Sequence, residues 1–474
     1  MLLVRGGQVV EPSGSQRADV LIDSGRIAAV GPEIDAPGAE ILDASGALVV
    51  PGAIDAHTHF GLPVGEVRSA DDFESGTIAA ACGGTTCVVD FAGAGRESPD
   101  VALGEWTANA SGRAVIDYGL HLTVTSVPDD PAEAARLFAS FLERGVASVK
   151  LYMAYPERLM VDDATLARAL TASVETGLLV CVHAEDGAEI ERLTARELEL
   201  GHVGPDAHPA TRPPEVEAAA IRRAAQLAGD AGAAVYVVHL SSAAGLREVR
   251  AANANGLRVL AETCPQYLYL TEDRLLATSE EAANFVCAPP LRADVDREAL
   301  WSGLADGSVQ VLATDHCPFT TSDRRRGVYA REEGWRTFRE IPGGLPGVET
   351  RLALGFQGVR QGRLPLVRWI DSVATAPARL FGLSHVKGSL AVGLDGDVVV
   401  FDPAAHHRLD ADRLHMATDH SPYAGMQVTG WPAITISRGT IVARDGEPWE
   451  AAPGRGHFVR RLPFDWPNPE LPGR

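Results

Sequence analysis

Between about residues 50 and 385, short apolar runs alternate with alanine-rich stretches that are typical of helices. Runs without an in-and-out alternation indicate strands buried on both faces, as in a parallel sheet covered by helices. The eight candidate strands are "ALVVPGAIDAH", "TTCVVDF", "DYGLHLTVT", "ASVKLYM", "LLVCVHA", "AVYVVHL", "RVLAETC" and "VQVLATDH". Most are followed by a helical stretch, which predicts an α/β fold with a (β/α)8 barrel. A doubly wound open sheet is the alternative, but no GxGxxG opens a helix after the first strand.

The two ends of the chain have a different pattern. The first fifty residues alternate short strands with glycine turns, and the same pattern returns in "GDVVVFDP" and "PAITISRGTIVARDG". We therefore expect both ends to pair into one small β-sandwich domain. The predicted boundaries are residues 1–50 and 386–450 for the two parts of this domain, 51–385 for the barrel and 451–474 for a tail.

The tail contains Phe458, Phe464 and Trp466, which would be unusual in a solvated segment. A floppy tail is the simpler interpretation. Because of the aromatic residues, we expect instead an arm that lies on a neighbouring subunit.

Charge and composition exclude several classes of partner. The formal net charge of −21 works against binding to nucleic acid or to anionic membranes. The densest basic stretch, "DRRRG" at residues 323–327, is short, and we expect a solvated loop there. No apolar run approaches the ~20 residues of a membrane helix, and the first residues do not resemble a signal peptide. Six scattered cysteines without a CxxC pair predict buried free thiols and a cytoplasmic location.

Polar residues of one kind gather at the ends of the predicted strands. In a parallel barrel the carboxyl ends of the strands form one face, where active sites are built. Two histidines two residues apart in a strand point the same way, so both can hold one ion. Any one of these residues alone would more often be structural, but together they predict a site for zinc or a similar divalent ion. The six candidate ligands are His57, His59, Lys150, His183, His239 and Asp315.

Lys150 stands inside the apolar strand "SVKLYMAY", where an ammonium is costly. Burial and nearby cations both favour the neutral amine, which can add carbon dioxide and become an anionic carbamate. A carbamate can bridge two metal ions, so we expect Lys150 to be carbamylated. The alternative is a lysine that reaches the rim and pairs with an acid such as Glu185.

An ordered set of motifs over nearly the whole chain resembles the cyclic amidohydrolases, and within them the dihydropyrimidinases and hydantoinases. The matching pieces are "PGAIDAHTHF", "SVKLYMAYP", "VHAED", "VVHLSS", "ETCPQYLYLT", "ATDHCPF", "IPGGLPGVETR" and "KGSLAVGLDGDVVVFDP". The resemblance implies a homotetramer that opens a cyclic ureide ring to an N-carbamoyl amino acid. It also implies two divalent metal ions that share a hydroxide, and we expect these ions to be zinc.

The resemblance also implies a role for each ligand. His57, His59 and Asp315 would hold the more buried metal, and His183 and His239 the more exposed one, with carbamylated Lys150 between them. Asp315 would move the proton from the hydroxide to the leaving nitrogen.

Residues around the metals would contact the substrate. Tyr155 would donate a hydrogen bond to the developing oxyanion, although it could instead only cover the barrel mouth. Main-chain groups at Ala288 and Gly343 would meet the amide edge of the ring; many hydantoinases have serine and asparagine there. Two loops could offer an apolar wall to a ring substituent or only pack against the barrel, through Phe60, Leu62 and Leu159.

Three alternatives within the superfamily stay open. Ala288 in "CAPPLR" favours an allantoinase, whereas Tyr155 and "DHCPF" favour a dihydropyrimidinase. Dihydroorotases usually have an arginine where this chain has Gly61. A scaffold protein that has lost its metals is the alternative from another class, but every ligand position is filled here.

Overall fold

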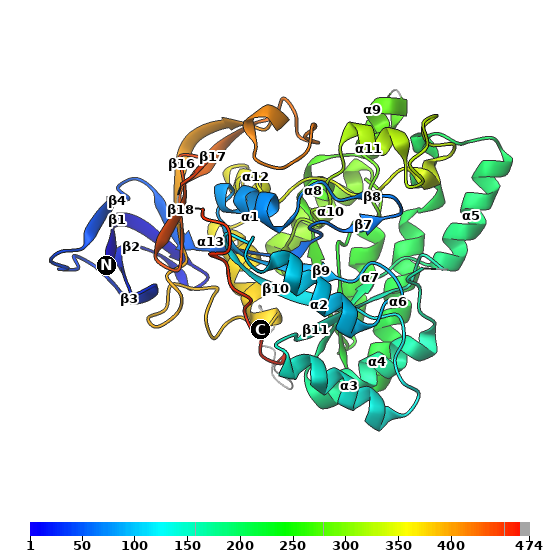
Figure 1. Cartoon of the computed structure of the whole chain (residues 1–474), viewed down its shortest axis with the longest axis horizontal. Helices are drawn as coiled ribbons and strands as arrows, with labels where there is room; N and C mark the ends of the chain where they lie inside the picture. The colour runs from blue at the N-terminus through cyan, green and yellow to red at the C-terminus, as the bar shows by residue number, and fades with distance from the viewer. Residues whose placement is uncertain (157, 278, 450, 465–474) are drawn as a thin grey trace.

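The computed structural model describes residues 1–156, 158–277, 279–449 and 451–464, and Figure 1 shows a helix-covered barrel with a smaller sheet beside it. The barrel sheet has the order β15-β14-β13-β12-β11-β10-β9-β6, and all its ladders are parallel. An isolated bridge between Thr58 and His316 joins the last strand region to the first. The strands are β6 (Ala53–Thr58), β9 (Thr85–Ala92), β10 (Asp117–Thr123), β11 (Ser148–Tyr152), β12 (Leu179–His183), β13 (Ala234–Val237), β14 (Arg258–Thr263) and β15 (Val311–Leu312). The predicted barrel is confirmed.

Local sequence signals set the helix boundaries. Helix α3, for example, begins with Pro131 at its first position, and the Asp130 side chain accepts hydrogen bonds from the amides of Ala132 and Glu133. In the described part of the chain, no helix is long and apolar enough to cross a membrane. The helices are α1 (Phe73–Cys82), α2 (Pro99–Ala110), α3 (Pro131–Glu143), α4 (Asp163–Thr176), α5 (Gly187–Glu199), α6 (Pro214–Ala231), α7 (Ala243–Ala254), α8 (Pro265–Tyr269), α9 (Ser279–Ala283), α10 (Asp294–Asp306), α11 (Thr321–Arg326), α12 (Arg351–Arg360), α13 (Leu366–Ile370) and α14 (Ala376–Leu380).

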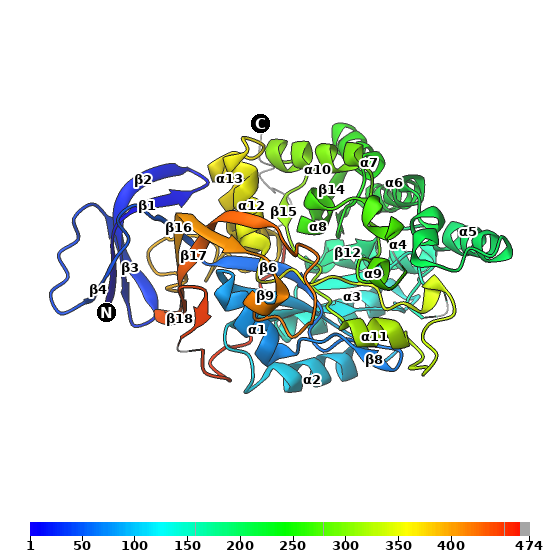
Figure 2. The same ribbon diagram turned by 90° about the horizontal axis from the view of Figure 1, so that it is seen from above.

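Both chain ends build the second sheet, as expected, and Figure 2 shows the N-terminal strands beside the C-terminal ones. Its order is β19-β18-β17-β16-β5-β1-β2-β3, with β4 paired to β1, so strands from both ends form one continuous sheet. Buried side chains of these strands form a hydrophobic core separate from that of the barrel. The strands are β1 (Leu2–Glu11), β2 (Gly14–Asp23), β3 (Arg26–Gly31), β4 (Glu40–Asp43), β5 (Leu48–Pro51), β16 (Val398–Arg408), β17 (Gln427–Ser437), β18 (Thr440–Arg444) and β19 (Glu447–Pro448). A short hairpin, β7 (Pro63–Val64) and β8 (Val67–Arg68), follows β6.

The predicted first strand, "ALVVPGAIDAH", is two strands. Its first half is β5 in the small sheet, and its second half is β6 in the barrel. Gly52 lies between the two strands. Only glycine fits at this position, because a Cβ there would lie 2.1 Å from the Thr86 hydroxyl oxygen. The chain thus passes from the small sheet into the barrel at Gly52.

The described part of the tail covers the amino end of its own barrel. Its backbone hydrogen-bonds to Tyr118, Gly145 and Gly177, all at or just before the starts of barrel strands. Phe464 is buried among side chains of the barrel interior. The expected contact with a neighbouring subunit stays a prediction, and Trp466 lies outside the described residues.

Candidate metal centre and substrate cavity

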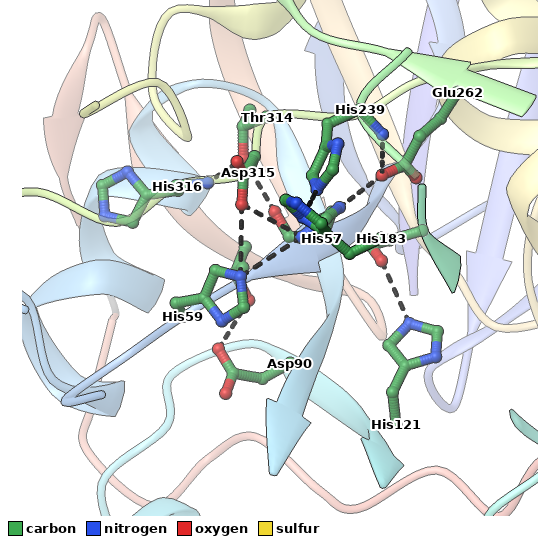
Figure 3. Close-up of polar contacts among 12 residues, drawn as sticks. His57, His59, Asp90, His121, His183, His239, Glu262, Thr314, Asp315 and His316 are labelled. Carbon is green, nitrogen blue, oxygen red and sulfur yellow. Dashed lines mark hydrogen bonds and ion pairs between the residues drawn. The ribbon is translucent and has the colours of Figure 1, made fainter. Parts of the chain in front are cut away.

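Three of the predicted ligands meet at the carboxyl ends of β6 and β15. The Nε2 atoms of His57 and His59 lie 3.2 Å apart, and Asp315 Oδ1 lies 3.0 Å and 3.1 Å from them. Figure 3 shows Asp315 directed at both rings. Three donor atoms that face one another at these distances form a ready site for one metal ion.

A second pair of ligands lies at the ends of β12 and β13. The His183 Nδ1 atom is 2.9 Å from His239 Nε2, and the His57 and His239 rings are 5.5 Å apart between centroids. Burial lowers the pKa of both His183 and His239, and it lowers the pKa of His59 to about 4. These imidazoles are therefore neutral at physiological pH, which is the form that binds metals.

Buried carboxylates hold the far side of two of these rings. Glu262, at the end of β14, bonds to His57 Nδ1, and Glu185 lies 2.8 Å from His183 Nε2. Such contacts fix the ring orientation and leave the other nitrogen for the ion. Sequence reasoning missed the role of Glu262, although a glutamate inside the apolar run "RVLAETC" was a usable signal.

Lys150 reaches the same centre from β11. Its side chain is buried, and its Nζ atom lies 4.7 Å from the centroid of the Phe91 ring and 5.1 Å from that of Tyr152. No hydrogen bond or ion pair joins Nζ to another described residue, and burial lowers the pKa of Lys150 to about 8. Glu185, the alternative partner, instead bonds to Arg212 and His183.

Three site residues have a strained backbone. Tyr155, His239 and Asp315 have φ angles of 66°, 39° and 53°, in the left-handed region that residues other than glycine rarely adopt. Strain of this kind collects at functional sites, where the surrounding structure holds a side chain in position. No sequence pattern revealed it.

The donor set fits divalent metal ions. Ligand bonds of ~2.0–2.1 Å to zinc place neighbouring donor atoms about 3.3 Å apart, close to the separations seen in both groups. Imidazoles with a carboxylate suit zinc and similar ions. The trio His57, His59 and Asp315 would hold one ion, and His183 with His239 a second.

A cavity of about 760 Å³ opens over this centre. Tyr155 lines it, with its ring centroid 5.3 Å from that of His183, and its hydroxyl has no hydrogen-bond partner among the described residues. Burial raises the pKa of Tyr155 to about 12, so the phenol keeps its proton and can donate it to a hydrogen bond.

The structure brings most of the predicted contact residues to this cavity. Leu62, Leu159, Ala288 and Gly343 line it. Phe60 does not, contrary to the expectation of substrate contact: its side chain is 2% exposed and packs under α1. Aromatic character alone could not separate a wall residue from a core residue.

The cysteines are not part of a disulfide framework. All six are buried and free, as predicted. Cys287 and Cys317 line the cavity beside the predicted substrate-contact residues. Burial raises the pKa of both thiols, which makes them poor nucleophiles at neutral pH.

Comparisons with known proteins agree with this centre. The model of the amidohydrolase family matches residues 48–442. The chain is 43% identical to a D-hydantoinase of Geobacillus stearothermophilus (98% of this chain, 97% of the relative) and 41% identical to one of Streptomyces coelicolor (97% of each). A dihydropyrimidinase structure from Brevibacillus agri superposes with a TM-score of 0.94 at 40% identity, over 98% of this chain and all of that one. The chain therefore belongs to the amidohydrolase family, in its hydantoinase and dihydropyrimidinase branch.

Proposed function

We propose that this protein hydrolyses one ring amide bond of hydantoins or dihydropyrimidines and releases an N-carbamoyl amino acid. The observation that carries the proposal is the buried amine of Lys150, which has no hydrogen-bond or ion-pair partner among the described residues and lies beside four imidazoles that we expect to bind metal. The names of the relatives, D-hydantoinase and dihydropyrimidinase, support the substrate class.

The composition of the chain supports a special chemical role for Lys150. The protein has only two lysines, Lys150 and Lys387, and every other basic residue of the lysine–arginine class is arginine. An arginine stays charged in proteins and cannot offer a neutral amine, whereas a buried lysine can. Three carboxylates hold Lys387 as an ammonium, so of the two lysines only Lys150 has surroundings that favour the neutral amine.

The geometry of the second ligand pair also favours a carbamate. His183 and His239 supply two nitrogens, but they belong to no described group of three metal-binding His, Cys, Asp or Glu side chains. Catalytic zinc sites usually have three protein ligands. A carbamate on Lys150 would supply the third donor there and a fourth donor to the first group.

Each side chain then has a defined task. A pair of divalent ions, which we expect to be Zn²⁺, would supply an activated water and polarise the ring carbonyl when bound. Asp315 accepts the proton from the attacking water and returns it to the ring nitrogen as the C–N bond breaks. The Tyr155 hydroxyl donates a hydrogen bond to the carbonyl oxygen as it gains negative charge.

The test is a rate panel with hydantoin, dihydrouracil and allantoin on zinc-loaded protein, with metal content measured on the same sample. We expect ring opening of hydantoin or dihydrouracil and two metal ions per chain. A clear preference for allantoin would make the protein an allantoinase. A metal-free protein that stays inert after reconstitution would support the scaffold alternative.

Carbamylation is tested independently of activity. With ¹³C-bicarbonate, we expect one carbamate signal in the NMR spectrum, which disappears in Lys150→Arg and remains in Lys387→Arg. Two lysines in the whole chain make this assignment direct.

A further inference from the structure

The stretch "DRRRG" is not the solvated loop that its charge suggested. Its three arginines end helix α11, where Arg325 and Arg326 are exposed but Arg324 is only 1% exposed. A fully buried guanidinium is costly unless its donors are paired, so its contacts explain why the fold keeps it.

Arg324 bonds to main-chain carbonyls of two separate loops. Its Nη1 atom donates to the oxygens of Ala283 (2.8 Å), Val286 (3.3 Å) and Pro342 (2.9 Å), and its Nη2 donates to that of Gly344. Its guanidinium carbon also lies 5.8 Å from the centroid of the Phe319 ring. The first loop follows β14 and the second follows α11, so one side chain joins two walls of the cavity.

None of these partners is a carboxylate. Burial lowers the pKa of Arg324 to about 10, so the group stays charged at neutral pH, and no described residue places an anion in hydrogen-bond contact with it. Only the planar fork of arginine can direct several donors at fixed angles; a lysine ammonium would reach fewer of these carbonyls.

By binding these carbonyls, Arg324 fixes the orientation of the peptide groups on either side of Gly343. The Pro342 carbonyl and the Gly343 amide belong to one planar peptide, in which C=O and N–H point in opposite directions. The next peptide is fixed too, because the Gly344 amide donates to the Val286 oxygen at 3.0 Å. The Gly343 N–H and C=O are therefore turned away from Arg324 and Val286.

Gly343 is exposed, lines the cavity and has no hydrogen-bond partner for its N–H or C=O among the described residues. A donor and an acceptor side by side match the alternating C=O and N–H groups along the edge of a cyclic ureide. In the adjacent loop, His208 Nε2 donates to the Cys287 carbonyl at 2.9 Å and in the same way orients the Ala288 amide.

We propose that Arg324 is a positioning residue for substrate recognition: it fixes the Gly343 peptide groups so that they meet the amide edge of the ring. The inference rests on the proposed ring-opening function, but it assigns to this arginine a role in ring selectivity.

The experiment compares Arg324→Lys and Arg324→Gln with the same changes at Arg325, whose side chain is 73% exposed on the same helix. Each variant is assayed for metal content, melting temperature, and kcat and KM for hydantoin and for succinimide. Succinimide is an imide of the same ring size in which one ureide N–H is replaced by a methylene group.

In the Arg324 variants we expect unchanged metal content and a KM for hydantoin that rises by roughly 10-fold, the scale of one lost hydrogen bond. The preference for hydantoin over succinimide should fall at least about fivefold, since succinimide lacks the second ureide N–H that the Gly343 carbonyl would accept and so loses less when this peptide is misaligned. The Arg325 variants should resemble the wild type. If Arg324 had only a structural role, its substitution would lower kcat/KM for hydantoin and for succinimide by the same factor. That result, or unchanged kinetics, would overturn the proposal.

If the Arg324 variants do not fold, Gly343→Pro tests the same idea, because proline removes the amide donor itself. Wild-type protein is the reference for metal content and melting temperature. We expect the proline variant to raise the KM for hydantoin more than that for succinimide with its metal content unchanged, and a wild-type KM would overturn the proposal. Failure of the wild type to open either ring would instead refute the proposed function.

Discussion

The two lysines of this chain are both buried, yet their surroundings are opposite. Lys387 Nζ lies 2.8, 3.0 and 2.7 Å from carboxylate oxygens of Asp117, Asp395 and Asp397. Burial alone would lower the pKa of Lys387, but these carboxylates raise it well above its usual value. Lys150 has no such partner in the part of the chain that the structure describes, and burial lowers its pKa. The fold stabilises an ammonium in one place and a neutral amine in the other.

The positions of the lysines match this difference. Lys387 joins the barrel to the small sheet, and Asp117 also accepts a hydrogen bond from the backbone of His457 in the tail. Lys150 faces the substrate cavity. We therefore expect substitutions at Lys387 to act on stability and those at Lys150 to act on chemistry.

The largest expected effect is at Lys150. Lys150→Ala should remove bound metal and lower kcat by at least about 10³-fold, the scale seen when one member of a cooperating catalytic group is lost. Short carboxylic acids should restore part of the rate by occupying the place of the carbamate. Metal analysis and initial rates check this, and a variant with both metals and full activity would contradict the bridge.

Lys387→Ala should do the reverse. It removes an ammonium that three carboxylates share, which should cost about 3–5 kcal/mol of unfolding free energy, the range for breaking a buried ion pair. Asp117 keeps Arg438 at 3.1 Å and Asp395 keeps Arg26 at 3.9 Å, so Asp397 loses most. Denaturant titration measures the loss. The folded fraction should keep its metals and its kcat, and a specific loss of kcat would remove the distinction between the two lysines.

Tyr155→Phe tests whether the Tyr155 hydroxyl at the cavity contributes to the reaction. We expect kcat to fall by roughly 10²-fold with metal content intact, as for loss of one oxyanion donor. The wild-type protein is the reference for metal content, and Tyr329→Phe is the control for a second tyrosine at the cavity. A rate equal to that of the wild type would leave Tyr155 with a packing role only.

The smallest expected effect is on the pH dependence of stability. Because the pKa of Lys387 is raised on folding, its contribution is complete below its unfolded pKa of about 10.4 and is lost as pH rises toward the folded value. The difference in melting temperature between wild type and Lys387→Met should stay constant from pH 7 to 9 and shrink above about pH 10.4. A difference that already shrinks between pH 7 and 9 would show that another group is responsible.

Sequence patterns predicted the barrel and the residues of the centre, because strand ends and the HxH spacing depend on local chain geometry. They could not predict contacts made across the fold. Phe60 and Arg324 show this limit: an aromatic residue near the ligands turned into the core, and a charged residue in a polar stretch was buried. The bonds of Glu262 to His57 and of Arg324 to Pro342 join distant segments, which no local pattern encodes.

The scarcity of lysine has a practical consequence for proteolysis. A protease specific for lysine has two cleavage positions in this chain, and the native fold hides both. Cleavage by such an enzyme therefore requires the chain to open, so the rate of fragment formation reports how often these two regions unfold.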